Sequence, residues 1–299
     1  MKKLFMAVIA LMMTMSVSAQ FYIYCSDGNV IKVDSISMVA PDAGDDPEPS
    51  TPSSGIGAFS VSKTKKVTFS RGNLQYTQST DTWSFAENQY DYLGEANIAI
   101  DADILAGKID LFGWSGSTGS AKFGVSTSSY SSDYSGSFVD WGTNQIGDDA
   151  PNTWRTLTYG EWDYLRYRRT NASSLVGVAQ VNGVNGLILL PDDWVCPAGI
   201  TFKSGFHSEW GVEAYGQYQT FTVEQWSKLE SAGAVFLPAA GFRGGLDMSC
   251  VQRRGHYWSA TKDGSYDVYA YYLRFYADET RTDNGSRYYG HSVRLVKDL

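Results

Sequence analysis

The chain has 299 residues and a formal net charge of −8, because 32 Asp and Glu outnumber 24 Lys and Arg. Without a basic stripe it is poorly suited to displacing the counterions of a nucleic acid or an anionic membrane, so we expect neither as a partner. The length is sufficient for a substantial core, and three cysteines are too few for a disulfide-stapled miniprotein.

Residues 1–19 predict a secretory signal peptide. A basic pair, Lys2 and Lys3, precedes an apolar run at 4–15, and residues 17–19 fit the small-x-small pattern for cleavage before Gln20. The run is too short to span a bilayer, and no later stretch reaches about 18 apolar residues. We therefore expect a secreted or cell-surface protein with no membrane insertion.

Residues 20–40 predict a small N-terminal β-hairpin segment. In FYIYCSDGNVIKVDSISMV, two strand-like runs flank Asp27 and Gly28, and Asp-Gly supplies the positive φ of a two-residue hairpin turn. Residues 41–56 concentrate Pro, Ser and acidic side chains, which cannot bury enough apolar area to order themselves. This stretch is a predicted linker.

Residues 57–299 predict one α+β domain with two helices and many short strands. Helices are expected near 158–169 and 222–233, since Thr158 with Glu161 and Thr222 with Gln225 have capping-box spacing. A period close to two predicts strands in KKVTFS, GLILLP, AVFLPAAG, YAYYLRFY and HSVRLV. The two Asn-Gly pairs in 181–186 are turn sites, and the Ser/Gly-rich stretch 115–137 predicts a long surface loop.

Few residues have the spacing of a known catalytic or metal site. The chain lacks a phosphate-binding loop and a Gly-x-Ser-x-Gly elbow, and its three histidines are too far apart for a zinc site on one helix. The acidic pairs at 148–149 and 192–193 lack EF-hand spacing. We expect no cofactor, with calcium left open. Paired carboxylates for glycoside hydrolysis are spaced in three dimensions, so no pair is singled out.

The cysteines leave two alternatives open. Cys196 and Cys250 either form a disulfide or remain buried free thiols, because sequence does not show whether they lie within bonding distance.

The stretch SYDVYAYYLRFY, 265–276, carries six aromatic residues in twelve positions. Strand alternation places Leu273 and Phe275, with Tyr269 and Tyr271, on an inward face. It places Tyr272, Arg274 and Tyr276 on the opposite, outward face. Tyr and Arg are favoured in binding sites because they offer large contact area at low entropic cost. The alternative is ordinary cross-strand pairing on a two-sided sheet.

The motifs LPAAGFRGG, GHYWSAT, AYYLRF and NGSRYYGHSVRLV resemble the C-terminal half of a C-type-lectin-fold family of exported Bacteroidetes proteins. This family is related to formylglycine-generating sulfatase-modifying domains and to the variable proteins of diversity-generating retroelements. Upstream stretches such as VTFSRGNLQY and IDLFGWSGS extend the resemblance over nearly all of 57–299. It implies a C-type-lectin-like fold with two helices, short and mostly antiparallel strands, and long loops.

The resemblance also implies a ligand face built by the C-terminal strands and their loops. The solvent-facing positions that one branch diversifies correspond here to His256, Ser265, Tyr266, Asp267, Tyr269, Tyr272, Arg274, Tyr276, Arg281 and Asn284. With Tyr288 added and Ser265 left out, these are the predicted ligand-binding residues.

Two departures from the family pattern bear on activity. The close C-terminal cysteine pair of the sulfatase-modifying branch is missing, so we do not expect such an enzyme, and the calcium motifs of animal lectins are also missing. We expect an exported module that binds a protein or glycan, such as a retroelement-diversified protein or an adhesin. The alternatives are a carbohydrate- or protein-modifying enzyme and a structural subunit of a surface appendage.

Overall fold

A computed structural model describes residues 21–24, 30–33, 57–94, 97, 108–116, 122–125, 134–245 and 247–299. The chain divides into two compact units, 1–50 and 51–299, and each is described by itself. The predicted signal peptide, 1–19, and the predicted linker, 41–56, lie outside the described residues. No helix of the described residues is long and apolar enough to cross a membrane.

The first unit contains the predicted hairpin. Strands β1 (Phe21–Tyr24) and β2 (Val30–Val33) pair in antiparallel register, with Tyr24 opposite Val30. The strand pairing is therefore confirmed, whereas the predicted turn at Asp27 and Gly28 lies outside the described residues.

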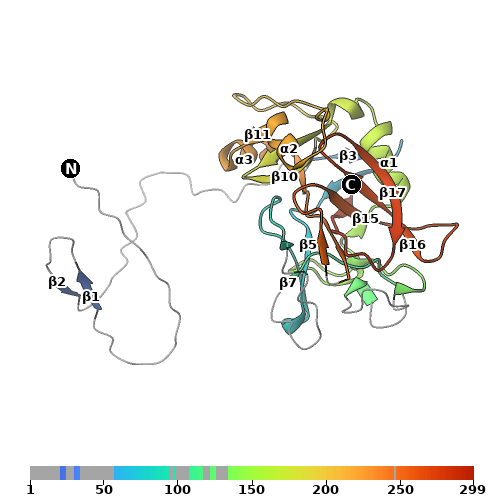
Figure 1. The fold of residues 1–299 in the computed structure, drawn as a ribbon, viewed down its shortest axis with the longest axis horizontal. Coiled ribbons are helices and arrows are strands. Elements are labelled where there is room, and N and C mark those ends of the chain that lie inside the picture. Colours follow the sequence, from blue (N-terminus) through green and yellow to red (C-terminus); the bar gives the residue numbers. More distant parts are fainter. Residues whose placement is uncertain are drawn as a thin grey trace. The chain divides into compact units, whose positions relative to one another are not determined.

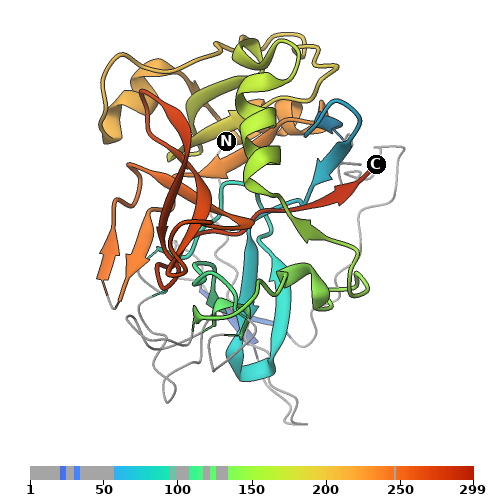
Figure 2. The same cartoon turned by 90° about the vertical axis from the view of Figure 1, so that its right-hand side faces the viewer.

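The second unit is α+β, and nearly all of its strand pairs are antiparallel (Figures 1 and 2). Its α-helices are α1 (Tyr159–Asp163), which continues as a π-helical turn (Tyr164–Arg168), α2 (Val212–Tyr218) and α3 (Val223–Ser231). Its strands are β3 (Phe59–Ser60), β4 (Lys66–Phe69), β5 (Leu74–Thr77), β6 (Thr82–Phe85), β7 (Lys108–Ile109), β8 (Arg155–Thr156), β9 (Val176–Val181), β10 (Val184–Leu189), β11 (Thr220–Phe221), β12 (Val235–Pro238), β13 (Phe242–Gly244), β14 (Asp247–Ser249), β15 (Gly255–Lys262), β16 (Tyr269–Phe275), β17 (Thr280–Ser286) and β18 (Leu295–Asp298).

Both predicted helices begin at their predicted capping boxes. The Glu161 amide donates to Thr158 Oγ1 at 3.2 Å, and the Glu161 carboxylate accepts from the Thr158 amide at 2.8 Å. Thr222 and Gln225 repeat the arrangement at α3. The expectation of two helices was wrong, because the described residues contain a third, α2. Its N-cap is Gly211, which makes no side-chain cap, so the sequence carries no start signal there.

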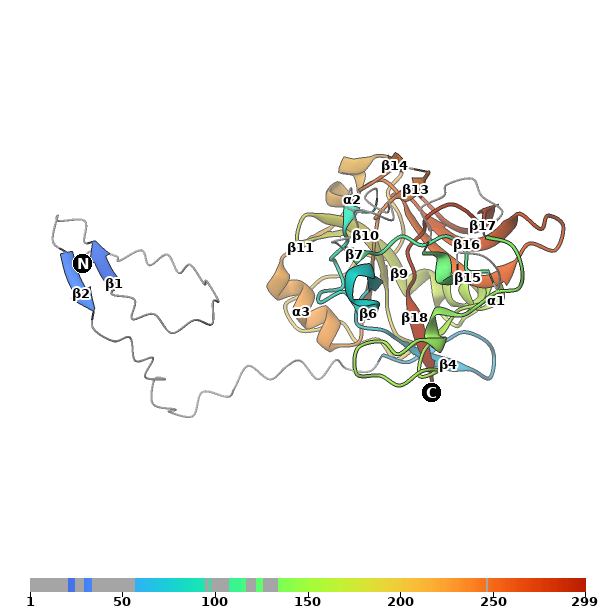
Figure 3. The same cartoon turned by 90° about the horizontal axis from the view of Figure 1, so that it is seen from below.

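The strands form several small sheets. One has the order β11-β9-β10-β12, and another has the order β3-β4-β18-β8. The β9–β10 turn uses Asn182 and Gly183 at φ 49° and 78°, which confirms the first Asn-Gly turn site. In the second sheet, β18 from the C-terminus pairs with β4 near the start of the unit, and the two lie side by side in Figure 3.

The sheet β15-β16-β17 separates two hydrophobic cores and lies against α1 (Figure 1). Leu273 and Phe275 of β16 pack into one core, as predicted. Ala270 and Tyr272 point the other way and pack into the second core. The expectation that Tyr272 faces solvent was therefore wrong, because both faces of the strand are covered.

Candidate ligand-binding site

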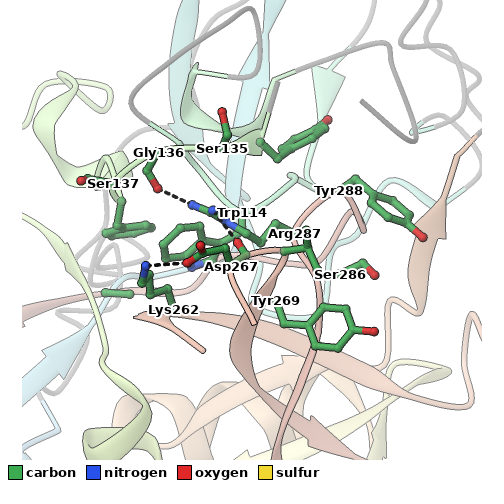
Figure 4. Close-up of a pocket in the computed structure, with 14 residues that line it drawn as sticks. Trp114, Ser135, Gly136, Ser137, Lys262, Asp267, Tyr269, Ser286, Arg287 and Tyr288 are labelled. Atoms are coloured by element: carbon green, nitrogen blue, oxygen red, sulfur yellow. Dashed lines mark hydrogen bonds and ion pairs between the residues drawn. The ribbon is translucent and has the colours of Figure 1, made fainter. Parts of the chain in front are cut away.

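A pocket of about 930 Å³ lies where segment 134–138 faces the start of β16 and the end of β17 (Figure 4). Both strand ends and the facing segment contribute side chains. Its lining residues are Trp114, Tyr134, Ser135, Gly136, Ser137, Phe138, Ala260, Lys262, Asp267, Val268, Tyr269, Ser286, Arg287 and Tyr288.

Aromatic rings form the inner wall of the pocket. Trp114 is almost fully buried, and its indole N–H donates to the Ser259 carbonyl at 2.8 Å, which fixes the plane of the ring. Phe138 packs beside it with ring centroids 5.0 Å apart. The guanidinium carbon of Arg287 lies 4.2 Å from the Trp114 ring centroid, within cation–π range. Trp114 therefore lies in contact with both Phe138 and Arg287.

Arg287 is held in place by the main chain on both sides of the pocket. Its Nη1 donates to the Asp267 carbonyl at 2.8 Å, and its Nη2 donates to the Gly136 carbonyl at 2.6 Å (Figure 4). Only 5% of the residue is exposed. Burial lowers its pKa, and the nearby Asp267 carboxylate opposes that shift. The guanidinium thus joins segment 134–138 to the loop before β16.

A charged pair lies at the rim. Lys262 Nζ lies 3.0 Å from Asp267 Oδ1, and both side chains are well exposed. The Lys262 ammonium holds the pKa of the Asp267 carboxyl below its usual range. Because water competes for both partners, the pair is weak and its groups remain accessible to a ligand.

Tyrosines and an exposed valine complete the rim. Tyr269 and Tyr288 are half-buried and line the pocket, while Val268 is 64% exposed. Tyr266, 61% exposed, packs against Tyr269 with ring centroids 5.6 Å apart. Rigid rings at a pocket mouth give a ligand apolar contact area, and their hydroxyls give it hydrogen bonds.

The predicted ligand-binding residues do not form one site. Asp267, Tyr269 and Tyr288 line the pocket, and Tyr266 lies beside it. Asn284 donates through Nδ2 to a carboxylate oxygen of Asp263, so its amide supports the loop before β16.

A second group lies further along the sheet. Arg274 and Arg281 are 2.8 and 3.4 Å from the Asp283 carboxylate. Tyr276 lies under the guanidinium groups of Arg254 and Arg274, at 4.5 and 5.0 Å from its ring centroid. These groups largely satisfy one another, and none of the predicted residues among them lines the pocket.

The remaining two predicted residues are buried, which corrects the expectation that they are offered to solvent. His256 and Tyr272 are 4% and 8% exposed, and their rings contact His291. Burial lowers the pKa of His256 to about 3 and raises that of Tyr272 to about 12. Neither side chain is available to an external ligand in this structure.

Several pocket residues were not predicted. Trp114 and Phe138 come from segments far from β16 in the sequence, and only the folded chain brings them together. Lys262 ends β15, and Arg287 follows β17 directly. The aromatic-rich loops around β16 indicated a binding site at this end of the sheet. They did not indicate that Trp114 and Phe138 form its opposite wall.

The described residues offer little support for hydrolytic or metal chemistry. The pocket lining contains one carboxylate, Asp267, whereas glycoside hydrolysis usually requires two. A second depression of about 780 Å³ includes Glu87 and Asp91, but Asp91 already accepts hydrogen bonds from Asn88. No described group of three or more His, Cys, Asp or Glu side chains is placed to hold a metal ion.

The cysteine alternatives are resolved toward free thiols. Cys196 is exposed and Cys250 is half-buried, and the two are not bonded. The expectation that both thiols are buried was wrong, because Cys196 is exposed and Cys250 is only half-buried.

Comparisons of the chain with family models, with curated proteins and with solved structures found no match. What the pocket binds is therefore inferred from its own residues.

Proposed function

We propose that this chain is an exported binding protein that holds a glycan unit in the pocket beside β16, on a C-type-lectin-like scaffold. The observation that supports this most is the rim itself. Tyr269 and Tyr288 offer ring surface beside the exposed Lys262–Asp267 pair, above an aromatic inner wall. A pyranose presents C–H groups on its faces and hydroxyls around its edge, which matches this combination of rings and polar groups.

The pocket favours a glycan over a folded protein surface as ligand. Its volume of about 930 Å³ lies at the upper end of the range for small-molecule sites, roughly 300–1,000 Å³. A concave site of that size encloses one or two sugar rings, whereas protein partners usually need a broad contact surface of about 800 Å² per partner. The scaffold proposal is supported by the α+β topology and by the position of the pocket at the C-terminal strands.

A matched pair of arginine substitutions tests this proposal. V268R places a long charged side chain at the pocket mouth, and V195R makes the same change at a site that does not line the pocket. Both valines are well exposed, at 64% and 78%, so both variants should fold. The wild-type chain is first screened on an immobilised glycan panel and on a panel of extracellular proteins, and the hits are then measured with both variants.

We expect the wild-type chain to bind at least one glycan, V268R to lose this binding and V195R to retain it. Equal binding by both variants would show that the ligand does not use this pocket. Hits confined to proteins would refute the glycan assignment.

A further inference from the structure

We infer that the glycan bound in this pocket carries an anionic group, a carboxylate or a sulfate ester. This rests on the proposed function, because it names the chemistry of the ligand for the same site. Three observations support it: an excess of positive charge in the pocket, a buried guanidinium without an ion pair among the described residues, and a rim ion pair that a ligand can open.

The pocket is positive although the chain is acidic. Its charged lining residues are Lys262, Asp267 and Arg287, which are two cations and one anion. The whole chain carries a formal net charge of −8. A concave site with low-dielectric walls focuses the field of its own charges, so this local excess attracts an anion despite the overall repulsion.

Arg287 lacks the counter-ion that a buried arginine usually has. The described residues give its guanidinium two main-chain carbonyls, and its Nε atom is buried without a hydrogen-bond acceptor. Asp267, the nearest acid acting on it, is already paired with Lys262. A buried charge without an opposite charge is costly, so an anionic ligand group at this wall would stabilise the site as well as bind to it.

A second buried arginine lies behind the same wall. Arg243 is 1% exposed and donates through Nη1 to the Gly245 carbonyl at 3.0 Å. It interacts electrostatically with Tyr134, a lining residue of the pocket. Its charge therefore adds to the positive potential of the pocket from the protein side.

Two arginines elsewhere in this unit are paired with acids. Arg155 contacts the carboxylates of Glu161 and Asp298 at 2.9 and 2.7 Å. Arg169, which is also buried, lies 3.2 Å from Asp192. Arg287 differs from these two, whereas the buried Arg294 bonds to the amide oxygens of Asn73 and Gln89 instead of a carboxylate.

Substitutions in the Lys262–Asp267 pair should change the affinity for an anion in opposite directions. Asp267 competes with any ligand anion for Lys262, since the two side chains are 3.0 Å apart. Removing the carboxylate with D267N frees Lys262 and should strengthen anion binding. Removing the ammonium with K262Q should weaken it. A direct hydrogen-bonding role of Asp267 toward sugar hydroxyls predicts the opposite result for D267N.

The probes are oligosaccharides immobilised as triplets that share one backbone. One member carries a uronic acid carboxylate, one carries a sulfate ester, and one is the carboxyl-reduced neutral sugar. Binding is measured for the wild type, D267N, K262Q and V268R, at low and at physiological salt. K228Q is the control, because Lys228 lies on α3 and does not line the pocket.

We expect at least one anionic member to bind about tenfold more tightly than its neutral twin, and salt to reduce that difference. K262Q should lower the affinity for it about five- to tenfold, D267N should raise it severalfold, and K228Q should leave it unchanged. The uronate and sulfate members show which anion is preferred.

Equal affinity for charged and neutral members, lost in V268R, would overturn the anionic inference and leave the proposed function standing. Weaker anion binding by D267N would also overturn it. If V268R leaves binding intact, or if no glycan binds, the proposed function fails together with the inference.

Discussion

The buried histidines predict that the protein loses stability when the pH falls from 7 to 5. His256 and His291 are 4% and 1% exposed, and their rings stack with centroids 5.0 Å apart. Burial lowers the pKa of His256 to about 3 and that of His291 well below its ordinary value, and their mutual proximity adds to the shift at His291. The His256 imidazole therefore stays neutral in the folded protein at pH 5, and burial opposes the protonation of His291 in the same way.

The unfolded chain behaves differently, because its histidines take up protons below a pKa of about 6.5. It binds more protons than the folded state throughout this range, so the free energy of unfolding falls as the pH falls. His256 accounts for a loss of about 2 kcal/mol between pH 7 and 5, and His291 adds a loss of the same sign.

One buried carboxyl acts in the opposite direction. Burial raises the pKa of Asp110 from 3.8 to about 6, so the folded state takes up this proton first as the pH falls. Asp110 therefore contributes a gain of about 1 kcal/mol between pH 7 and 5. The loss from His256 exceeds this gain by about 1 kcal/mol, and His291 enlarges the net loss.

Urea unfolding followed by far-ultraviolet circular dichroism at pH 7 and pH 5 measures the difference. H256Q should reduce the loss by about 2 kcal/mol, whatever its effect on stability at pH 7. H207Q is the matched control, since His207 is only half-buried and lies outside the stacked pair. An unchanged free energy of unfolding between the two pH values, or an equal effect of both variants, would refute the reasoning.

Three further substitutions test the described packing by urea unfolding. Y272A should lower the free energy of unfolding by about 3–5 kcal/mol, because it leaves a cavity in the second core. A decrease below about 1 kcal/mol would indicate that the Tyr272 side chain is exposed instead. T222A should cost about 1 kcal/mol by removing the α3 cap, with T220A on the exposed edge of β11 as control. G183A should cost about 1–2 kcal/mol, because φ is 78° there and nothing crowds the position, and no cost would contradict the turn geometry.

Local signals in the sequence predicted the parts of the fold that depend on neighbouring residues. The capping boxes at Thr158 and Thr222 and the turn at Asn182 each act within about four positions, so the residues that form them are adjacent in the chain. Helix α2 begins at Gly211 without such a signal, and its formation depends on packing, with Tyr215 fully buried. Composition and spacing do not contain that information.

The error at Tyr272 has a different physical cause. Alternation along β16 correctly separates Leu273 and Phe275 from Tyr272, but it does not say whether the second face is covered. Trp258 and His291 contact the Tyr272 ring from the strand beside it and from the segment before β18. A two-sided buried strand and a half-exposed one can therefore share the same pattern.

The pocket was only half-predictable for a related reason. Asp267, Tyr269 and Tyr288 lie on loops and strand ends that the aromatic-rich sequence marks directly. The opposite wall depends on Trp114 and Phe138, which reach β16 through contacts between segments far apart in the chain. Residues that meet in this way can be identified only when the three-dimensional structure is known.

The most direct test of the proposed function is a crystal structure of the protein with the saccharide that binds it most tightly. We predict a sugar ring beside Val268, between Tyr269 and Tyr288, with its anionic group within about 4 Å of Lys262 Nζ. A saccharide bound instead against Tyr276 and Arg274, or elsewhere on the molecule, with this pocket empty, would contradict it.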